Sequence, residues 1–414
     1  MRKLAVLALT GAVVLGGRPG ALDRTFGVHG KLTTKVGVVS WADTVAVQRD
    51  GKIVVAGWSG TITTNRFTTA RYLRRGILDR SFGSRGIVRT SFGGTSVVLD
   101  LALQRDGKIL AVGYASAGQN NIALARYNRD GSLDRSFGRD GKVTTRFATN
   151  SIGRAVAVQA DGKIVVSGNI SGGAFALVRY RPNGSLDRSF GTGGRVTTDF
   201  SPESGGAHAA AEALAIQRDG KIVAGGEAGG HETTEIALAR YRPNGSLDPT
   251  FGSGGIVTAF HSGLTTNSAE GLRPQPDGNL VVGGGVNGSF ALFRLRRNGS
   301  FDPSFGETGG VTLTDVGIPN GSFAFGMAVQ RDGKFVLAGN ATPGRKDLFA
   351  LARFDRDGLL DPGFRPVTTS ISRGDDVGYD VALAPDGRIV VAGTADENGP
   401  SGGRFAVVRY LATG

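Results

Sequence analysis

Cysteine is absent from all 414 residues of the chain. Disulfide bonds, thiolate metal sites, cysteine nucleophiles and a lipid-modified cysteine anchor are therefore excluded. The four histidines follow no catalytic-triad pattern. The sequence also lacks a G-x-x-x-x-G-K-[ST] phosphate loop, a G-x-S-x-G nucleophile elbow and an HExxH zinc motif. We therefore predict no catalytic residues of these classes, no cofactor and no metal ion.

Long hydrophobic runs are missing after the first residues. The start, "MRKLAVLALTGAVVLGGRPGA", has two basic residues followed by a short apolar run, which is the pattern of an export signal. We predict a signal peptide over residues 1–21, with an uncleaved membrane anchor as the alternative. The remaining residues, 22–414, are expected to be secreted, periplasmic or at the cell surface as one domain.

Glycine, in contrast, is abundant: its 68 residues are more than twice the usual share. Two phrases account for many of them and return with periods of 53 to 61 residues. The Asp-Gly of phrases such as "VAVQRDGKIVVAG" has its aspartate at Asp50, Asp106, Asp161, Asp219, Asp277, Asp332 and Asp386. The phrase "LDxxFG" has its aspartate at Asp23, Asp79, Asp134, Asp187, Asp248, Asp302 and Asp361. The chain is therefore one domain of seven units.

Each unit contains four strand-like runs, which in the third unit are "KVTTRF", "RAVAVQ", "KIVVSG" and "FALVRY". The Asp161-Gly162 turn and the "RPNGS" segment join successive runs as tight hairpins. Seven units of four antiparallel strands predict an all-β fold, a seven-bladed β-propeller. A parallel β-helix is the rival, but its coils are much shorter than these repeats.

The repeat "VQxDGKIVVAG…ALARYxxxGSLDxSFG…G.VTT" resembles the delta-60 repeat family, a bacterial propeller-type repeat of uncharacterised function. The resemblance covers residues 22–411 and rests on a long phrase that recurs seven times. It implies a propeller and an exported bacterial setting, and it brings no catalytic residues. The last copy departs from the pattern, because Arg365 replaces glycine after Phe364.

A constant spacing indicates that the repeated phrase is scaffold. The arginine of "ARY" and the aspartate of "LD" are eight residues apart and should face each other across a hairpin, where opposite charges pair. The phenylalanine three residues after the aspartate should pack between neighbouring blades. We predict these structural ion pairs: Arg71–Asp79, Arg126–Asp134, Arg179–Asp187, Arg240–Asp248, Arg294–Asp302 and Arg353–Asp361.

Two other connections in each unit vary in length and should lie on one face of the ring, where binding groups are most often found. The richest of these loops flank the fourth Asp-Gly. They supply the candidate ligand-binding residues Glu203, His208, Glu212, Glu227, His231, Glu232 and Glu235. A divalent metal is conceivable there, but solvated loops are the simpler reading. "DRDGLLD", from Asp355 to Asp361, resembles part of a calcium loop, yet turn chemistry explains it without an ion.

The formal net charge of +13 suggests weak binding to acidic polymers, through a ring of hairpin lysines on the constant face: Lys52, Lys108, Lys163, Lys221 and Lys334. No stacking platform for nucleic acid is evident. We interpret the differences between repeats as falling mostly on glycine, serine, threonine and asparagine, without the convergent acids and bases of a catalytic site. The sequence therefore favours a monomeric binding scaffold whose partner is an extracellular protein or glycan. The alternative is an enzyme, a hydrolase or lyase on an extracellular polymer, with its site at the mouth of the variable face.

The chain begins in a "VTT" strand and ends in a "VRY" strand. We predict that "VTT" is the outermost strand of each blade, because the small apolar "AVAVQ" run suits the crowded axis. Lys31 to Lys35 should then complete the last blade beside "FAVVRY" and close the ring.

Overall fold

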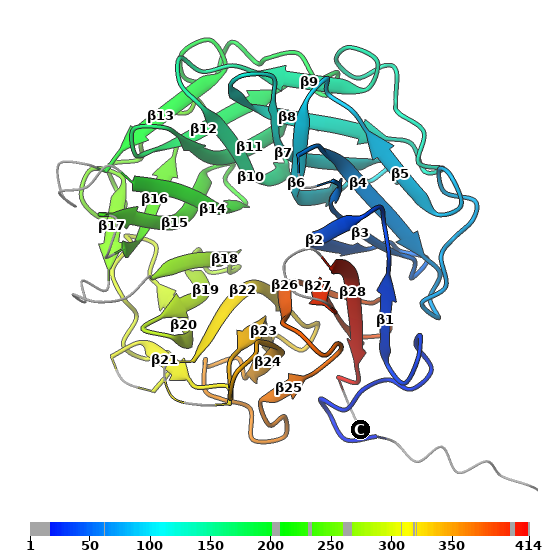
Figure 1. Cartoon of the computed structure of the whole chain (residues 1–414). Helices are drawn as coiled ribbons and strands as arrows, with labels where there is room; N and C mark the ends of the chain where they lie inside the picture. Colours follow the sequence, from blue (N-terminus) through cyan, green and yellow to red (C-terminus); the bar gives the residue numbers. More distant parts are fainter. Residues whose placement is uncertain are drawn as a thin grey trace, which may run out of the picture.

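The computed structural model describes residues 17–61, 63–200, 208–230, 234–259, 267–307, 309–317, 319, 321–397 and 402–412. Their secondary structure consists of strands and turns, arranged as seven four-stranded antiparallel sheets around a common axis (Figure 1). The predicted seven-bladed β-propeller is confirmed. Among the described residues, no helix is long and apolar enough to cross a membrane.

The strands occupy equivalent places in every blade. The inner strands are β2 (Val39–Val47), β6 (Thr95–Leu103), β10 (Ser151–Val158), β14 (His208–Ile216), β18 (Ser268–Pro274), β22 (Ser322–Val329) and β26 (Asp376–Leu383). The second strands are β3 (Ile53–Gly60), β7 (Ile109–Ser116), β11 (Ile164–Ile170), β15 (Ile222–Gly229), β19 (Leu280–Val286), β23 (Phe335–Ala341) and β27 (Ile389–Asp396). The third strands are β4 (Asn65–Tyr72), β8 (Asn120–Tyr127), β12 (Ala174–Tyr180), β16 (Thr234–Tyr241), β20 (Ser289–Leu295), β24 (Leu348–Phe354) and β28 (Gly403–Tyr410). The outer strands are β1 (Lys31–Thr34), β5 (Ile87–Thr90), β9 (Lys142–Thr145), β13 (Arg195–Asp199), β17 (Ile256–Ala259), β21 (Val311–Thr314) and β25 (Val367–Thr369).

The ring closes as predicted, with "VTT" outermost and the "AVAVQ" run at the axis. Strand β1 pairs with β28, from Lys31 opposite Val408 to Thr34 opposite Phe405, and completes the blade that starts at β26. Residues before β1 also contact the last strand, because Gly20 N donates to Leu411 O at 2.8 Å. Both ends of the propeller therefore lie in one blade.

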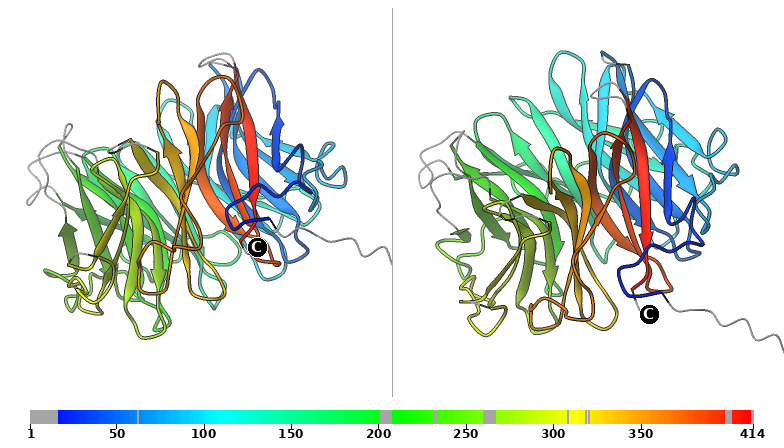
Figure 2. Two further views of the ribbon diagram at one scale, coloured as in Figure 1. Left: turned by 90° about the horizontal axis from the view of Figure 1, so that it is seen from below. Right: turned by 60° about the horizontal axis from the view of Figure 1, so that its bottom comes forward.

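The antiparallel order places the connections on two faces of the ring, which Figure 2 shows from the side. The Asp-Gly hairpins between inner and second strands lie on one face, together with the hairpins that follow the third strands. The connections from each outer strand to the next inner strand, and from each second strand to the third, lie on the opposite face. We call this second face the variable-loop face, because it carries the connections that differ in length between units.

A buried ring of ion pairs joins the blades. All six predicted arginine–aspartate pairs are present, and a seventh joins Arg409 to Asp23 from opposite ends of the chain, with N–O distances of 2.6–2.9 Å. Each guanidinium also lies 4.4–4.7 Å from the centre of the "FG" phenylalanine ring. Arg126 Nη1 donates to Pro182 O of the next blade at 2.5 Å, so the ring holds neighbouring blades together.

The "FG" phenylalanines pack between blades, as the sequence predicted. Phe82 is fully buried, and a Cβ on Gly131 of the next blade would lie 2.9 Å from its ring. Gly131 also has a φ of 86°, which favours glycine. The glycine of the repeated "NGS" or "DGS" turn is thus required both by backbone conformation and by the ring that it covers.

The hairpin lysines are part of the same ring. Lys52 Nζ lies 3.1 Å from Asp79 Oδ2, and Lys108 Nζ lies 2.9 Å from Asp134 Oδ2. Lys163, Lys221 and Lys334 make the equivalent contacts at 2.7–3.5 Å. The sequence placed these lysines on the constant face, and the structure shows that each is held by a buried carboxylate.

Candidate functional site

A β-bulge interrupts every inner strand at the same place. The pairing with the second strand shifts, for example, between Ala42 and Thr44 in β2 and between Gly378 and Asp380 in β26. A bulge leaves one residue unpaired and redirects its side chain, and bulges are common beside functional sites. The seven redirected residues each precede the Asp-Gly aspartate by seven positions. They are Asp43, Leu99, Arg154, Glu212, Glu270, Phe325 and Tyr379, and we call them the collar.

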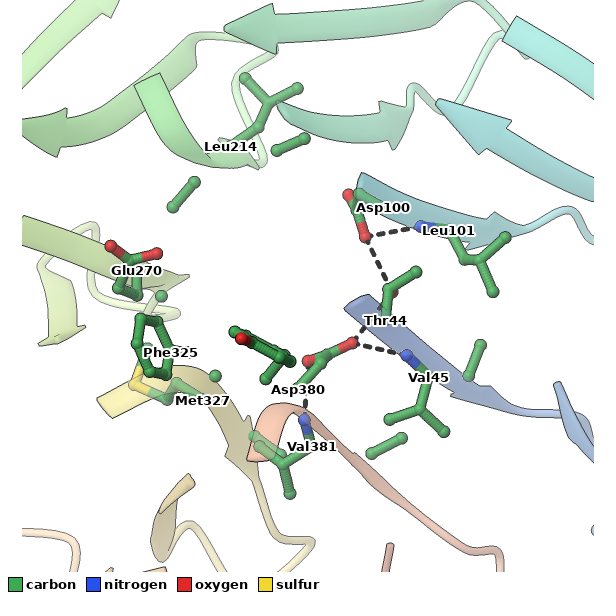
Figure 3. Close-up of a pocket in the computed structure, with 18 of the residues that line it drawn as sticks. Thr44, Val45, Asp100, Leu101, Leu214, Glu270, Phe325, Met327, Asp380 and Val381 are labelled. Carbon is green, nitrogen blue, oxygen red and sulfur yellow. Dashed lines mark hydrogen bonds between the residues drawn. The ribbon is translucent and has the colours of Figure 1, made fainter. Parts of the chain in front are cut away.

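The collar lines the central channel, where a cavity of about 770 Å³ is bordered by residues of all seven inner strands. This volume lies within the range typical of ligand sites. Figure 3 shows Glu270 and Phe325 projecting from β18 and β22 toward the channel. Two residues further along each inner strand, every blade carries an aliphatic side chain: Val45, Leu101, Val156, Leu214, Leu272, Met327 and Val381. This aliphatic layer is therefore alike in all seven blades, whereas the collar differs between them.

One sector of the collar is ionic. Arg154 Nη1 lies 2.8 Å from Glu212 Oε1 and 3.0 Å from Glu212 Oε2. Arg154 Nε donates to Asn169 Oδ1 at 3.0 Å, which fixes the plane of the guanidinium. On the variable-loop side, His208 Nε2 lies 2.8 Å from Glu227 Oε1. Of these contacts, the Arg154–Glu212 pair connects the third and fourth blades.

The opposite sector is aromatic. The rings of Phe325 and Tyr379 are 5.4 Å apart between centroids, and Tyr379 lies 6.1 Å from Trp41. Trp41 stacks on Trp58 at 6.2 Å with an interplanar angle of 9°. Phe323 extends the group, 4.9 Å from Phe325. All five side chains are only partly buried, so ring surface remains accessible to a ligand.

Just below the collar, two carboxylates join neighbouring inner strands. Asp100 accepts from Leu101 N and Val156 N, each at 2.7 Å, and Asp380 accepts from Val381 N at 2.7 Å and Val45 N at 2.9 Å. The Thr44 hydroxyl lies between them, 3.0 Å from Asp380 and 3.4 Å from Asp100 (Figure 3). Burial and the nearby charge of Asp380 raise the pKa of Asp100 to about 7. These bonds give the two aspartates a structural role between blades.

The carboxyl groups of the collar resist ionisation. Burial raises the pKa of Asp43 to about 8, and Asp43 Oδ2 is a buried atom without a hydrogen-bond partner. Burial, together with the charges of Glu212 and Glu227, raises the pKa of Glu270 well above its usual value. The pKa of Glu212 is also raised by burial, although Arg154 opposes this. Asp43 and Glu270 are thus collar carboxyls without an ion-pair partner among the described residues, whereas Glu212 is paired with Arg154.

Replacing Asp43 by asparagine should stabilise the protein at high pH. A carboxyl whose pKa is raised on folding contributes stability below its unfolded value, near 4, and this stability is lost as pH rises through about 8. Asp43→Asn removes that loss, so the variant should gain about 1–3 kcal/mol over the wild type at pH 9 and little at pH 4. Urea unfolding at pH 4, 6, 8 and 9 measures this. The exposed Asp140→Asn is the control; a pH-independent difference for Asp43→Asn would contradict the assignment.

The structure brings together three of the seven residues that the sequence singled out. His208, Glu212 and Glu227 lie in the ionic sector, on β14 and β15. Glu235 lies on the third strand of that blade, β16, opposite Ala228. The predicted residues Glu203, His231 and Glu232 lie outside the described residues.

Sequence reasoning missed most of the collar. It judged that the repeats differ mainly in glycine, serine, threonine and asparagine, and this was wrong at the channel, where the differing residues are charged or aromatic. The signal was present: the position seven residues before each Asp-Gly aspartate reads Asp, Leu, Arg, Glu, Glu, Phe and Tyr along the chain. In an alternating strand pattern these residues look like ordinary outward-facing positions, and only the bulge turns them into the channel.

The described residues contain no group of three or more histidine, aspartate or glutamate side chains arranged to hold a metal ion. In "DRDGLLD", Asp355 Oδ1 accepts from Asp357 N at 2.9 Å and from Leu359 N at 3.0 Å. That carboxylate therefore closes a turn.

The fold and the repeat define a β-propeller built from one recurring unit. A family model described as "Domain of unknown function (DUF5122) beta-propeller" matches residues 48–82, 104–137, 159–190, 217–251, 275–305, 330–364 and 384–414. These matches cover more than half of the chain, so the protein belongs to this family. A search of curated proteins finds no match.

Solved structures match this chain at low sequence identity and with TM-scores below 0.5. Virginiamycin B lyase from Staphylococcus aureus is 11% identical, with 89% of this chain and 94% of that chain covered and a TM-score of 0.49. The polysaccharide lyase Uly1 is 10% identical, with 98% and 94% covered and a TM-score of 0.49. Sqt1 of Chaetomium thermophilum, bound to the N-terminus of a ribosomal protein, is 12% identical, with 92% and 98% covered and a TM-score of 0.48. Enzymes and a binding protein occur among them, and these likenesses do not choose between the two functions.

Proposed function

We propose that the protein is a ligand-binding β-propeller whose site is the central channel, with the collar as the contact surface at the end of the cavity nearer the variable-loop face. One observation carries this proposal: seven bulges at equivalent places redirect seven side chains that are not equivalent, into a cavity of about 770 Å³. Residues that only hold blades together are repeated in this chain. The collar side chains depart from the repeat in charge and size, which is what a specific site needs.

The arrangement suits a small ligand or the end of a longer one. Aromatic faces lie on one side of the mouth and charged groups on the other, so a bound molecule would meet both apolar and polar contacts. The hairpin lysines on the constant face support the acidic-polymer alternative less well, because each is already paired with a buried aspartate. Export of the protein and membership of the delta-60 repeats remain part of this proposal, and residues 1–16 lie outside the described residues.

Phe325→Ala should weaken binding of a collar ligand. An aromatic contact contributes about 0.5–1.5 kcal/mol, which corresponds to a loss of up to about tenfold in affinity. The measurement is binding to a panel of glycans, amines and small metabolites, with the affinity of each hit determined by calorimetry. Phe92→Ala is the matched control, because Phe92 is a partly buried aromatic residue that packs on Phe67 away from the collar. Equal affinities for both variants and the wild type would remove the collar as the site.

A second candidate function, an enzyme acting on an extracellular polymer, is favoured by Asp43 alone. A carboxyl with a pKa of about 8 holds its proton at neutral pH and could donate it to a leaving group. Asp43→Asn separates the two functions. An enzyme would lose turnover of any polymer that it degrades, whereas a binding protein would convert no ligand in either form.

A further inference from the structure

The collar carries more acidic than basic side chains. Its three carboxyls, Asp43, Glu212 and Glu270, share the collar with one guanidinium, that of Arg154, which Glu212 engages at 2.8 Å. The other guanidinium of the cavity, that of Arg273, donates to Leu272 O and Met327 O in the layer below. In the part of the chain that the structure describes, no ion pair reaches Asp43 or Glu270. The whole protein has a formal net charge of +13, so this local excess of acid is opposite in sign to the rest of the molecule. A cation entering the channel would supply the missing counter-charge.

The aromatic sector adds a second, independent feature that points to the same ligand. Phe325 belongs to the strand next to that of Glu270, and its ring lies 5.4 Å from that of Tyr379. Tyr379 in turn contacts Trp41. Ring faces attract cations, most strongly where both are withdrawn from water. A cavity lined by aromatic rings and by carboxyl groups without ion-pair partners is the combination that recognises organic cations. A neutral polar ligand would gain little from it.

The layer below the collar fits the apolar part of such a ligand. Leu272 follows Glu270 by two residues and Met327 follows Phe325 by two, and both line the cavity. Aliphatic side chains occupy this position in every blade. A hydrated inorganic ion would gain little from this surface, whereas methyl or alkyl groups on a nitrogen would bury apolar area against it.

We propose that the collar binds an organic cation of the alkylammonium or quaternary ammonium class, with its charge held between Glu270 and the rings of Phe325 and Tyr379. This inference rests on the proposed function and names its ligand class. Glu212, Glu227 and Arg154 are the charged groups that act on Glu270, and Arg154 is already paired. A bound cation would favour the ionised form of Glu270, so binding should release protons and tighten as pH rises.

Choline and its uncharged isostere 3,3-dimethyl-1-butanol test the proposal, because they differ chiefly in the charge. Calorimetry on the full chain should show at least a tenfold preference for choline, because only choline carries the charge that the rings and Glu270 would contact. Glu270→Gln should reduce choline affinity about tenfold and leave the isostere unchanged. Glu307→Gln is the control, because Glu307 is exposed and the substitution removes the same charge away from the channel. Thermal melting of each variant verifies folding, and Phe325→Ala provides a second route if Glu270→Gln does not fold.

The outcomes separate this inference from the proposed function. Equal affinity for choline and its isostere would overturn the inference that the ligand is an organic cation. An unchanged choline affinity in both Glu270→Gln and Phe325→Ala would overturn it as well. If a glycan from the panel binds in a Phe325-dependent way and choline does not displace it, the channel is a binding site for another class and the cation inference fails alone. If no compound binds in a way that depends on the collar, both fail.

Discussion

Arg179→Ala is expected to lower the free energy of unfolding by about 3–5 kcal/mol. Arg179 and Asp187 form an ion pair at 2.8 Å, with side chains only 6% and 4% exposed, and removing one partner of a buried pair leaves the other without compensation. Burial alone would raise the pKa of Asp187, but hydrogen bonds from Ser189 and the charges of Arg179 and Lys163 lower it to about 2. The carboxylate is therefore ionised at neutral pH, and truncating Arg179 leaves a buried charge.

The same substitution removes contacts to the next blade. Arg179 Nη1 donates to Pro243 O at 2.5 Å, and the guanidinium lies 4.5 Å from the centre of the Phe190 ring. Urea unfolding of Arg179→Ala, Arg179→Lys and the control Arg188→Ala measures the effect. Arg188 is exposed, so its substitution should change stability by no more than about 0.5 kcal/mol. Lysine should rescue only part of the loss, because it cannot reproduce the forked contacts. An effect of Arg179→Ala as small as that of Arg188→Ala would show that the ring does not hold the blades together.

The sequence was informative where the chain repeats itself. Seven copies of one phrase establish the unit, and the eight-residue spacing establishes the pairing of Arg179 with Asp187. The first repeat begins with a "VTT" strand and the last ends with a "VRY" strand, which establishes which strand closes the ring. These features recur because each blade must pack against the next in the same way. Even the seventh pair, Arg409 with Asp23, follows from the ring geometry once the ends of the chain meet.

The sequence was less informative about contacts between side chains that lie far apart along the chain. Lys52 precedes Asp79 by many residues, and only the folding of two hairpins side by side brings them within 3.1 Å. The collar escaped notice for a related reason. Arg154 and Glu212 lie on different blades, and a bulge in each strand is needed before they meet. Comparing the seven units position by position would have exposed the collar, because it is a layer of the channel where charged and aromatic residues replace one another.

Blocking the collar should abolish ligand binding altogether. The chain has no cysteine, so a single introduced thiol can be modified without side reactions at other thiols. Leu99 is the collar residue without a charge or a ring, and it lies on β6, the inner strand of the second blade. Leu99→Cys therefore leaves the ionic and aromatic sectors intact. A bulky maleimide attached there would occupy the channel mouth and exclude a ligand by volume. Arg49→Cys, on an exposed Asp-Gly hairpin of the constant face, is the matched control.

The most direct test of a collar site is therefore the binding profile of the Leu99→Cys protein across the panel of glycans, amines and small metabolites, before and after modification. We predict that the unmodified protein binds as the wild type does, that modification at position 99 removes binding by at least a hundredfold, and that modification at position 49 has no effect. Binding that survives modification at position 99, in a protein shown by mass spectrometry to be fully labelled, would place the site away from the central channel and contradict the account.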